Sequence, residues 1–467
     1  MCILLAAALA LAACGQRRAV EPAPDPAPTV ASEPPRFPPR VVEAARLLSD
    51  AGEGPTTAWD RLAHLADTFG HRLCGSKALE DAIDWSLEVM RQDGLEDVRR
   101  EKVMVPHWDR GEEWARVRAP VDRELHVLGL GGTVDTGGQP VRAELEVVGS
   151  LAEIDRRGDE LRGKVVLIDQ AMPPYDPVTR DSGYGEAAEI RFDGPSRAAK
   201  AGAVALLTRS LTARSFQTPH TGVLGYADDA PRIPAAAVTI EDAGLLSRLR
   251  ARGPVTIELF LGARTLPDAE SGNAIGELRG REIPEEIVVV GAHSDSWDVG
   301  DGSVDDGSGV VMALEAARLL KSLGLVPRRT VRVVLFTNEE NGLRGGRAYQ
   351  AEHDGERHAA GIEADSGAAE PWGFGVVGSP DQVAALQRYA PLFERLGADT
   401  IEEGYAGVDL IPLSETGVLS LGIHPDGSTY FDYHHSPADT LDRIDPRHLQ
   451  RNAAALALMA FILAERE

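Results

Sequence analysis

Apolar residues recur every three or four positions at both ends of the chain, which is the spacing of an amphipathic helix. Residues 59–69 and 79–93 show it near the amino terminus, and residues 446–465 show it at the carboxyl terminus. From about residue 272, short β-branched runs such as 287–290 alternate with helical segments such as 310–321. Strands that alternate with helices predict an α/β fold with a mixed, mostly parallel sheet sandwiched by helices.

A different pattern fills residues 122–266. Short apolar runs there are separated by glycine and proline, which is typical of a mostly β unit. The runs lie at residues 143–148, 164–168, 204–207 and 255–261, with helical spacing at 196–203 and 241–252. We therefore expect residues 122–266 to be a domain inserted into a catalytic domain made of residues 41–121 and 267–467.

The first fourteen residues form an apolar segment that ends in Leu11-Ala12-Ala13-Cys14. It is too short to span a bilayer and ends in small residues, so residues 1–14 are predicted to be an export signal. Its last four residues resemble the processing site of bacterial lipoproteins, where the cysteine becomes the lipidated first residue. Residues 15–40 are rich in proline and alanine and predict an extended linker. We expect an exported protein, periplasmic or on the cell surface, with a lipid anchor; plain secretion is the alternative.

The composition is that of a globular protein and argues against a nucleic-acid partner. At 467 residues the chain is long enough for two packed units, and 43% of its residues are hydrophobic. Its formal charge of −25 is unsuited to nucleic acid, because binding a polyanion relies on a basic surface. If Cys2 and Cys14 belong to the signal, only Cys74 remains in the folded part, which makes an intramolecular disulfide impossible.

A candidate metal ligand follows the predicted strand at 287–290. The sequence continues Gly291-Ala292-His293-Ser294-Asp295 at the carboxyl end of the strand, where open α/β sheets place their sites. A histidine alone is more often structural. Asp295 supports a ligand role for His293, because a metal-bound imidazole usually donates its second N–H to a carboxylate. We expect Asp295 to orient His293 without binding metal itself.

A glycine-rich loop with several carboxylates occupies residues 297–309. Such loops can bind phosphate through their N–H groups, but this one is acidic and lacks the lysine of phosphate-binding loops. A cation fits it better. Asp305 is the candidate for a carboxylate that bridges two metal ions. Capping of the following helix is the alternative role, and it suits Asp306 as well.

Two further predicted strands end in acidic residues. The strand at 330–337 is followed by Asn338-Glu339-Glu340, and the strand at 360–364 is followed by Asp365. Adjacent glutamates raise each other's pKa, so they are costly unless they are functional. One of them can bind metal while its neighbour takes a proton from water. Three successive strand ends thus offer ligands to one rim of the sheet.

The last candidate ligand lies near the carboxyl terminus, in Tyr433-His434-His435-Ser436, where one of the two histidines would complete the site. Imidazole and carboxylate ligands together suit zinc. A set of five ligands with one bridging carboxylate suits two zinc ions per chain better than one. Two metals about 3.5–4 Å apart can act together on a water molecule and a carbonyl group.

These motifs together resemble the co-catalytic zinc exopeptidase family, which includes bacterial leucyl aminopeptidases, and they resemble its carboxypeptidase Q branch most. The resemblance is carried by residues 293–300, 305–307, 339–340, 365, 435–436 and 439–440, and it extends to 67–73 and 105–113. It covers nearly everything after the linker. The fold it implies is phosphorylase/hydrolase-like, with an inserted protease-associated-like domain, and it also implies a homodimer.

The resemblance assigns roles that the residues alone leave open. The implied ligands are His293 and Asp365 for one zinc, Glu340 and His435 for the other, and Asp305 as the bridge. Glu339 would be the general base. His435 is preferred to His434, because the family's histidine directly precedes the serine or threonine of its motif. A cis peptide bond between Asp305 and Asp306 is also implied.

The implied reaction is hydrolysis of a terminal peptide bond in a dipeptide or short peptide, with the specificity of the carboxypeptidase Q branch. A zinc aminopeptidase is the alternative enzyme, and the sequence leaves both open. A catalytically inactive binding protein on the same fold is the alternative from another class. The intact ligand positions argue against that alternative.

Overall fold

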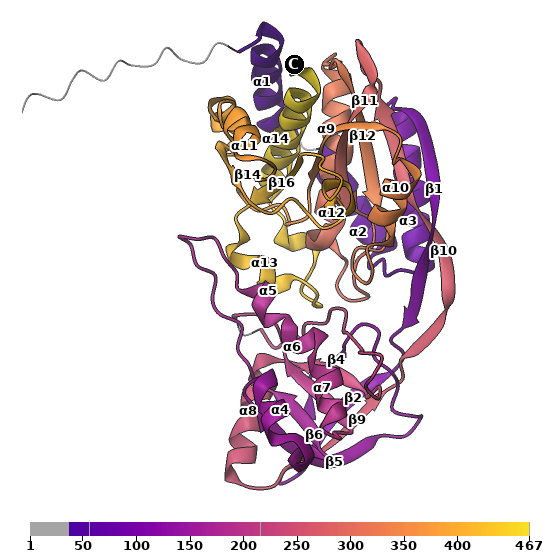
Figure 1. The fold of residues 1–467 in the computed structure, drawn as a ribbon, viewed down its shortest axis with the longest axis vertical. Helices are drawn as coiled ribbons and strands as arrows, with labels where there is room; N and C mark the ends of the chain where they lie inside the picture. Colours follow the sequence, from indigo (N-terminus) through magenta and orange to yellow (C-terminus); the bar gives the residue numbers. More distant parts are fainter. Residues whose placement is uncertain (1–36, 56, 215, 467) are drawn as a thin grey trace, which may run out of the picture. The chain divides into compact units, whose positions relative to one another are not determined.

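The computed structural model describes residues 37–55, 57–214 and 216–466. The predicted signal at 1–14 lies outside the described residues, as does the predicted linker up to residue 36. Residues Pro38–Glu467 form one continuous unit, which contains both sheets found in the described residues (Figure 1).

The first sheet is mixed and, within the described residues, has eight strands in the order β1-β10-β12-β11-β13-β16-β14-β15. Its strands are β1 (Glu96–Asp109), β10 (Arg264–Leu278), β11 (Ile283–His293), β12 (Arg329–Phe336), β13 (Arg357–Glu363), β14 (Pro371–Val377), β15 (Thr400–Glu403) and β16 (Ser420–Pro425). The central strands β12, β11, β13 and β16 are parallel, whereas β10 and β14 join them antiparallel. This confirms the predicted α/β class with a mixed, mostly parallel sheet.

Helices cover both faces of the first sheet. Alternate residues of a strand point to opposite faces, so Val288 and Val290 of β11 enter one core while Ile287 and Val289 enter another. The first core includes α1 (Pro39–Gly52), α2 (Thr57–Phe69), α3 (Lys77–Gln92), α9 (Ser308–Ser322) and α14 (Pro446–Glu465); the second includes α10 (Arg344–Glu352) and α12 (Ile411–Ser414). The expected sandwich is therefore present.

The apolar helix α14 packs against α1 and α9 and over strands β11 to β13 (Figure 1). Its residues from Leu449 onwards are largely buried, which explains why its apolar pattern extends beyond a single face. Neither α14 nor any other described helix combines the length and hydropathy of a membrane span.

The second sheet is built from the chain between β1 and β10. Its order is β3-β2-β9-β5-β6-β7-β8-β4 within the described residues. Its strands are β2 (Glu113–Ala119), β3 (Arg123–Leu125), β4 (Val127–Gly129), β5 (Val141–Val148), β6 (Val165–Ile168), β7 (Ala205–Arg209), β8 (Ala235–Val238) and β9 (Thr256–Leu261). It starts before the expected boundary at residue 122, because β2 pairs with β9 of this sheet. We call residues 113–261 the second-sheet region.

Helices pack on both faces of the second sheet, so the region is less purely β than its pattern indicated. One face carries α4 (Leu151–Arg157), α5 (Tyr184–Ala187), α6 (Glu189–Phe192) and α7 (Gly194–Lys200), and the other carries α8 (Ile240–Arg252). The segments between the apolar runs, which were expected to be turns, therefore include short helices.

An aromatic cluster and an ion pair join the end of β1 to the glycine-rich loop that was predicted to bind metal. Trp108 and Trp297 belong to one buried apolar cluster with Leu73. Arg110 donates from Nε to Asp298 Oδ2 (2.8 Å) and from Nη2 to Asp298 Oδ1 (2.5 Å). The point where the chain leaves the first sheet is thus fixed against the loop.

Candidate metal centre and active site

The predicted site residues converge at the carboxyl ends of the central strands. His293 closes β11, Asp305 lies in the turn before α9, Glu339 and Glu340 follow β12, Asp365 follows β13, and His435 follows α13 (Tyr430–Tyr433). Strands β11, β12 and β13 are parallel neighbours, so their carboxyl ends share one rim of the sheet.

Asp305 lies between the two histidines. Its Oδ1 is 3.2 Å from His293 Nε2, and its Oδ2 is 3.3 Å from His435 Nε2. Each histidine has one further carboxylate nearby: Asp365 Oδ1 is 3.5 Å from His293 Nε2, and Glu340 Oε2 is 3.0 Å from His435 Nε2. The side chains thus form two groups that share Asp305, which is the division that the family resemblance implied.

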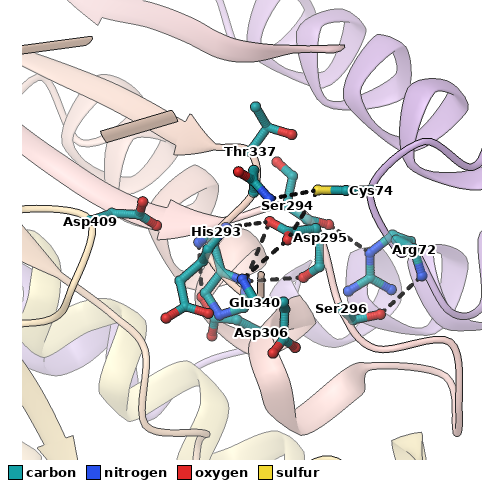
Figure 2. A network of polar contacts seen from close by, with 12 residues as sticks. Arg72, Cys74, His293, Ser294, Asp295, Ser296, Asp306, Thr337, Glu340 and Asp409 are labelled. Atoms are coloured by element: carbon teal, nitrogen blue, oxygen red, sulfur yellow. Dashed lines mark hydrogen bonds and ion pairs between the residues drawn. The ribbon is translucent and has the colours of Figure 1, made fainter. Parts of the chain in front are cut away.

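The main chain orients His293. Its Nδ1 lies 3.0 Å from the carbonyl oxygen of Asp295, whereas the Asp295 carboxylate is 3.9 Å away. A hydrogen bond to a carbonyl oxygen requires the proton on Nδ1, so Nε2 is the ring nitrogen that is left to bind a metal ion. The Asp295 carboxylate instead accepts from the N–H group of Glu339 (3.1 Å). It also accepts from the N–H group of Glu340 (3.3 Å), which lies beside it in Figure 2. Asp295 therefore organises the site through contacts other than the expected one.

The buried carboxylates of the site raise the pKa values of the titratable groups around them. Burial, together with the charges of Asp365 and Glu340, raises the pKa of Glu339 well above its usual range. Burial and the charge of Asp305 do the same to the pKa of Glu340. Burial alone would lower the pKa of His293, but its contacts with Asp305 and Asp365 outweigh burial and raise it. A divalent cation would supply the charge that these groups otherwise draw from protons.

Unsatisfied polar atoms lead to the same conclusion. Within the described residues, His293 Nε2 and Glu340 Oε2 are buried and make no hydrogen bond of acceptable geometry. Buried polar groups in folded proteins are almost always paired. Imidazole nitrogens and carboxylate oxygens that face one another in this way are the ligands that zinc binds. The residues therefore fit zinc.

Asp306 is the nearest alternative to Asp305, because its carboxylate, His293 and Asp365 are close enough to hold an ion. Both of its oxygens are already engaged. Oδ2 accepts from the N–H of His293 (3.1 Å), and Oδ1 accepts from the N–H of Gly309 (3.1 Å) in the first turn of α9. Asp306 thus has the capping role that was the alternative for this pair. The peptide bond between Asp305 and Asp306 is cis, as the resemblance implied.

His434 is the alternative to His435. Its Nε2 lies 3.5 Å from Asp305 Oδ2, and its ring stacks on that of His435 with the centroids 3.5 Å apart. Burial and the neighbouring His435 lower the pKa of His434 well below its usual range. His435 is closer to Asp305 and also meets Glu340, so the geometry favours His435 as the ligand.

Two residues that sequence reasoning did not single out hold the glycine-rich loop, residues 297–309, in shape. The fully buried guanidinium of Arg72 donates to the carbonyl oxygens of Gly70, Ser294, Asp301 and Gly302 at 2.7–3.0 Å. Asp439 accepts from the N–H of Val304 (2.7 Å) and of Asp305 (3.1 Å). Burial and repulsion from Asp305 raise the pKa of Asp439 to about 8. Both residues lie in the motifs that carried the family resemblance, which was the only signal for them.

Replacing Arg72 by methionine should weaken both the fold and metal binding. The change leaves several buried carbonyl oxygens without donors, so we expect a free energy of unfolding lower by about 2–4 kcal/mol. We also expect zinc affinity to fall about 10–100-fold, the usual cost of losing a residue behind the ligands. Denaturant unfolding and zinc titration measure these effects. Arg46→Met, on the exposed face of α1, is the control and should change neither the free energy of unfolding nor the zinc affinity. If Arg72→Met matched the wild type in both quantities, the role of Arg72 would be contradicted.

A cavity of about 850 Å³ opens beside the candidate ligands. Asp305, Glu339 and His435 line it from the first-sheet side, and Tyr184 and Arg191 line it from the second-sheet region. Both parts of the chain therefore form the wall of this cavity.

The model of peptidase family M28 matches residues 273–460. The chain is 39% identical to carboxypeptidase Q of Mus musculus over 428 residues, which are 91% of this chain and 89% of the relative. The chain belongs to peptidase family M28. A Peptidase M28 precursor from Shewanella amazonensis has a crystal structure that matches at 34% identity and a TM-score of 0.88, over 91% of this chain and 97% of that chain. BSAP, a zinc aminopeptidase from Bacillus subtilis, shares the fold at 22% identity and a TM-score of 0.65, over 88% and 95%.

Membership of the family confirms the predicted α/β fold and the predicted class of enzyme, an exopeptidase. In this M28 peptidase the matched region, 273–460, contains every candidate ligand and the candidate base. Arg72 and the second-sheet region precede it, although both contact the site.

Proposed function

We propose that this M28 peptidase uses two zinc ions to hydrolyse a terminal peptide bond of dipeptides or short peptides. His293 and Asp365 would hold one ion, Glu340 and His435 the other, and Asp305 would bridge them. The observation that carries the proposal is that each carboxylate oxygen of Asp305 faces one imidazole Nε2, at 3.2 and 3.3 Å. Two histidines and three carboxylates in this arrangement suit a pair of zinc ions.

Glu339 would be the general base. Bound zinc supplies Lewis-acid activation of water and of the scissile carbonyl. Glu339 lines the cavity, and its carboxylate forms no hydrogen bond or ion pair with another described residue. Burial and neighbouring acids raise its pKa, which lets it keep the proton taken from water. It then passes that proton to the leaving nitrogen, so that one water is consumed and an acid and an amine are formed.

The name of the Mus musculus relative supports a carboxypeptidase, and a zinc aminopeptidase is the alternative. The two differ in the terminus they need. An aminopeptidase fails on dipeptides with a blocked amino group, whereas a carboxypeptidase cleaves them. Comparing blocked and unblocked dipeptides therefore separates these candidates.

Other proposals concern the chain beyond the site. We propose that the second-sheet region is a protease-associated-like domain, that the chain forms a homodimer, and that Cys14 carries a lipid anchor after export. These rest on the family resemblance and on the pattern of the first forty residues.

Chelation should abolish activity, and zinc should restore it. We expect about two zinc ions per chain by elemental analysis and loss of dipeptide hydrolysis after dialysis against a chelator, because the base has no activated water without metal. Readdition of zinc should recover the initial rate. Full activity in the metal-free protein would disprove the proposal, and one zinc per chain at full activity would disprove the two-ion form of it.

A further inference from the structure

Two arginines line the cavity beside the proposed zinc site, and both come from the second-sheet region. The charge of Arg180 is matched, because its Nη1 lies 3.2 Å from Glu402 and its guanidinium lies 3.9 Å from the ring centroid of Trp372. Arg191 is 4% exposed and forms no ion pair with any described residue. A buried charge without a partner is costly, so a ligand of opposite charge is the natural counterpart of Arg191.

Neutral groups hold the guanidinium of Arg191 in place. Nε donates to the carbonyl oxygen of Val223 (3.0 Å), and Nη1 donates to the Tyr184 hydroxyl (2.9 Å) and to the carbonyl oxygen of Thr221 (3.1 Å). Gly222 leaves room for it, since a Cβ there would lie 2.0 Å from Nη1. Its Cζ also lies 5.1 Å from the ring centroid of Phe192 and 5.6 Å from that of Tyr184. The group is therefore oriented while no carboxylate of a described residue pairs with its charge, and Nη2 donates to no described residue.

Thr221 connects Arg191 to the metal site. Its carbonyl oxygen accepts from Arg191, while its N–H donates to the carbonyl oxygen of His435 (2.9 Å). The guanidinium is thus linked through Thr221 and two hydrogen bonds to the main chain of a proposed zinc ligand, and Arg191 and His435 line the same cavity. In a substrate cleaved at its last bond, the terminal carboxylate follows the scissile carbonyl by one residue, about 3.3–3.6 Å of extended chain.

We propose that Arg191 binds the free α-carboxylate of the substrate, so that the enzyme removes the last residue of a peptide or splits a dipeptide. Guanidinium pairs with carboxylate through two parallel hydrogen bonds, which fixes the orientation of the substrate as well as its charge. This inference rests on the proposed function and states which end of the substrate the enzyme recognises, the free carboxyl terminus. A peptide amide lacks the charge and would leave Arg191 buried and unmatched.

The test compares Ala-Leu with Ala-Leu-amide in the zinc-loaded enzyme. We expect wild-type kcat/KM to be about 10–100-fold higher for the acid, the range for one charge-assisted pair. Arg191→Met should bring the ratio of acid to amide close to one by lowering only the value for the acid. Arg191→Lys keeps the charge without the paired hydrogen bonds and should give an intermediate ratio. The control is Arg197→Met in the same region, where Arg197 is paired with Asp155 (2.8 Å) and Asp193 (3.1 Å); it should keep the wild-type ratio.

Calorimetry gives a second measurement that does not depend on turnover. A dipeptide with a CH₂–NH group in place of the peptide bond should bind about 10–100-fold more tightly as the acid than as the amide, and equally in Arg191→Met. Equal binding of acid and amide to the wild type, or an equal loss of both in Arg191→Met, would overturn the role of Arg191. Preferential binding of the acid without hydrolysis of any dipeptide would support Arg191 and disprove the proposed function instead.

Discussion

Glu339→Gln should lower kcat for dipeptide hydrolysis by about 10²–10⁴-fold, the usual contribution of a general base, while the protein still folds and binds zinc. The amide of glutamine has nearly the shape of the carboxylate but cannot take a proton. The side chain of Glu339 lines the cavity and forms no hydrogen bond or ion pair with another described residue. The hydrogen bonds of this residue are made by its main chain: its N–H donates to Asp295, and its carbonyl oxygen accepts from Gly342. In this variant kcat should therefore fall while the zinc content stays that of the wild type.

Steady-state kinetics and elemental analysis of the same preparation measure both quantities. Glu340→Gln offers the sharpest comparison, since the neighbouring residue is expected to lose metal along with rate. Glu403→Gln, at an exposed position of the edge strand β15, should change neither quantity and controls for loss of a surface charge. Normal turnover by Glu339→Gln would remove Glu339 from the mechanism, and loss of zinc would show that it is a ligand instead.

The ligands could be predicted from sequence because their positions follow from a local pattern. Short β-branched runs predict buried parallel strands, and His293, Glu340 and Asp365 come directly after such runs. Parallel neighbours end on the same rim, so residues far apart in sequence meet without any knowledge of side-chain contacts. Asp305 is a harder case, because its neighbour Asp306 has the same side chain. The choice between Asp305 and Asp306 as the ligand depends on the hydrogen bond that Asp306 accepts from a helix N–H group, and only the three-dimensional structure reveals that bond.

Residues that act through long-range contacts could not be recognised in this way. Arg72 lies in a loop and Arg191 in the short helix α6, and neither segment has a periodic pattern that indicates function. Both side chains donate to carbonyl oxygens far along the chain, Arg72 to that of Gly302 and Arg191 to that of Val223. The start predicted for the inserted domain, residue 122, falls inside the second-sheet region for a similar reason. The pairing of β2 with β9 joins Glu113 to Leu261, and no local pattern at residue 113 indicates which sheet the strand will enter.

His435→Phe should remove one zinc ion and nearly all activity, whereas His434→Phe should keep both. Phenylalanine preserves an aromatic ring in the stacked pair and removes only the ring nitrogens, so the two variants are matched. His435 Nε2 meets both Glu340 (3.0 Å) and Asp305 (3.3 Å), while His434 Nε2 approaches only Asp305, at 3.5 Å.

Losing a ligand should cost His435→Phe more than the roughly 10–100-fold in zinc affinity that residues behind the ligands contribute. Zinc titration of the two variants side by side measures the difference. If His434→Phe lost the ion and His435→Phe retained it, the assignment would be reversed. His434 would then be the ligand, and the ring of His435 would only support it. Equal loss in both variants would mean that the stacked pair binds the ion as a unit, because both Nε2 atoms lie near the same oxygen of Asp305.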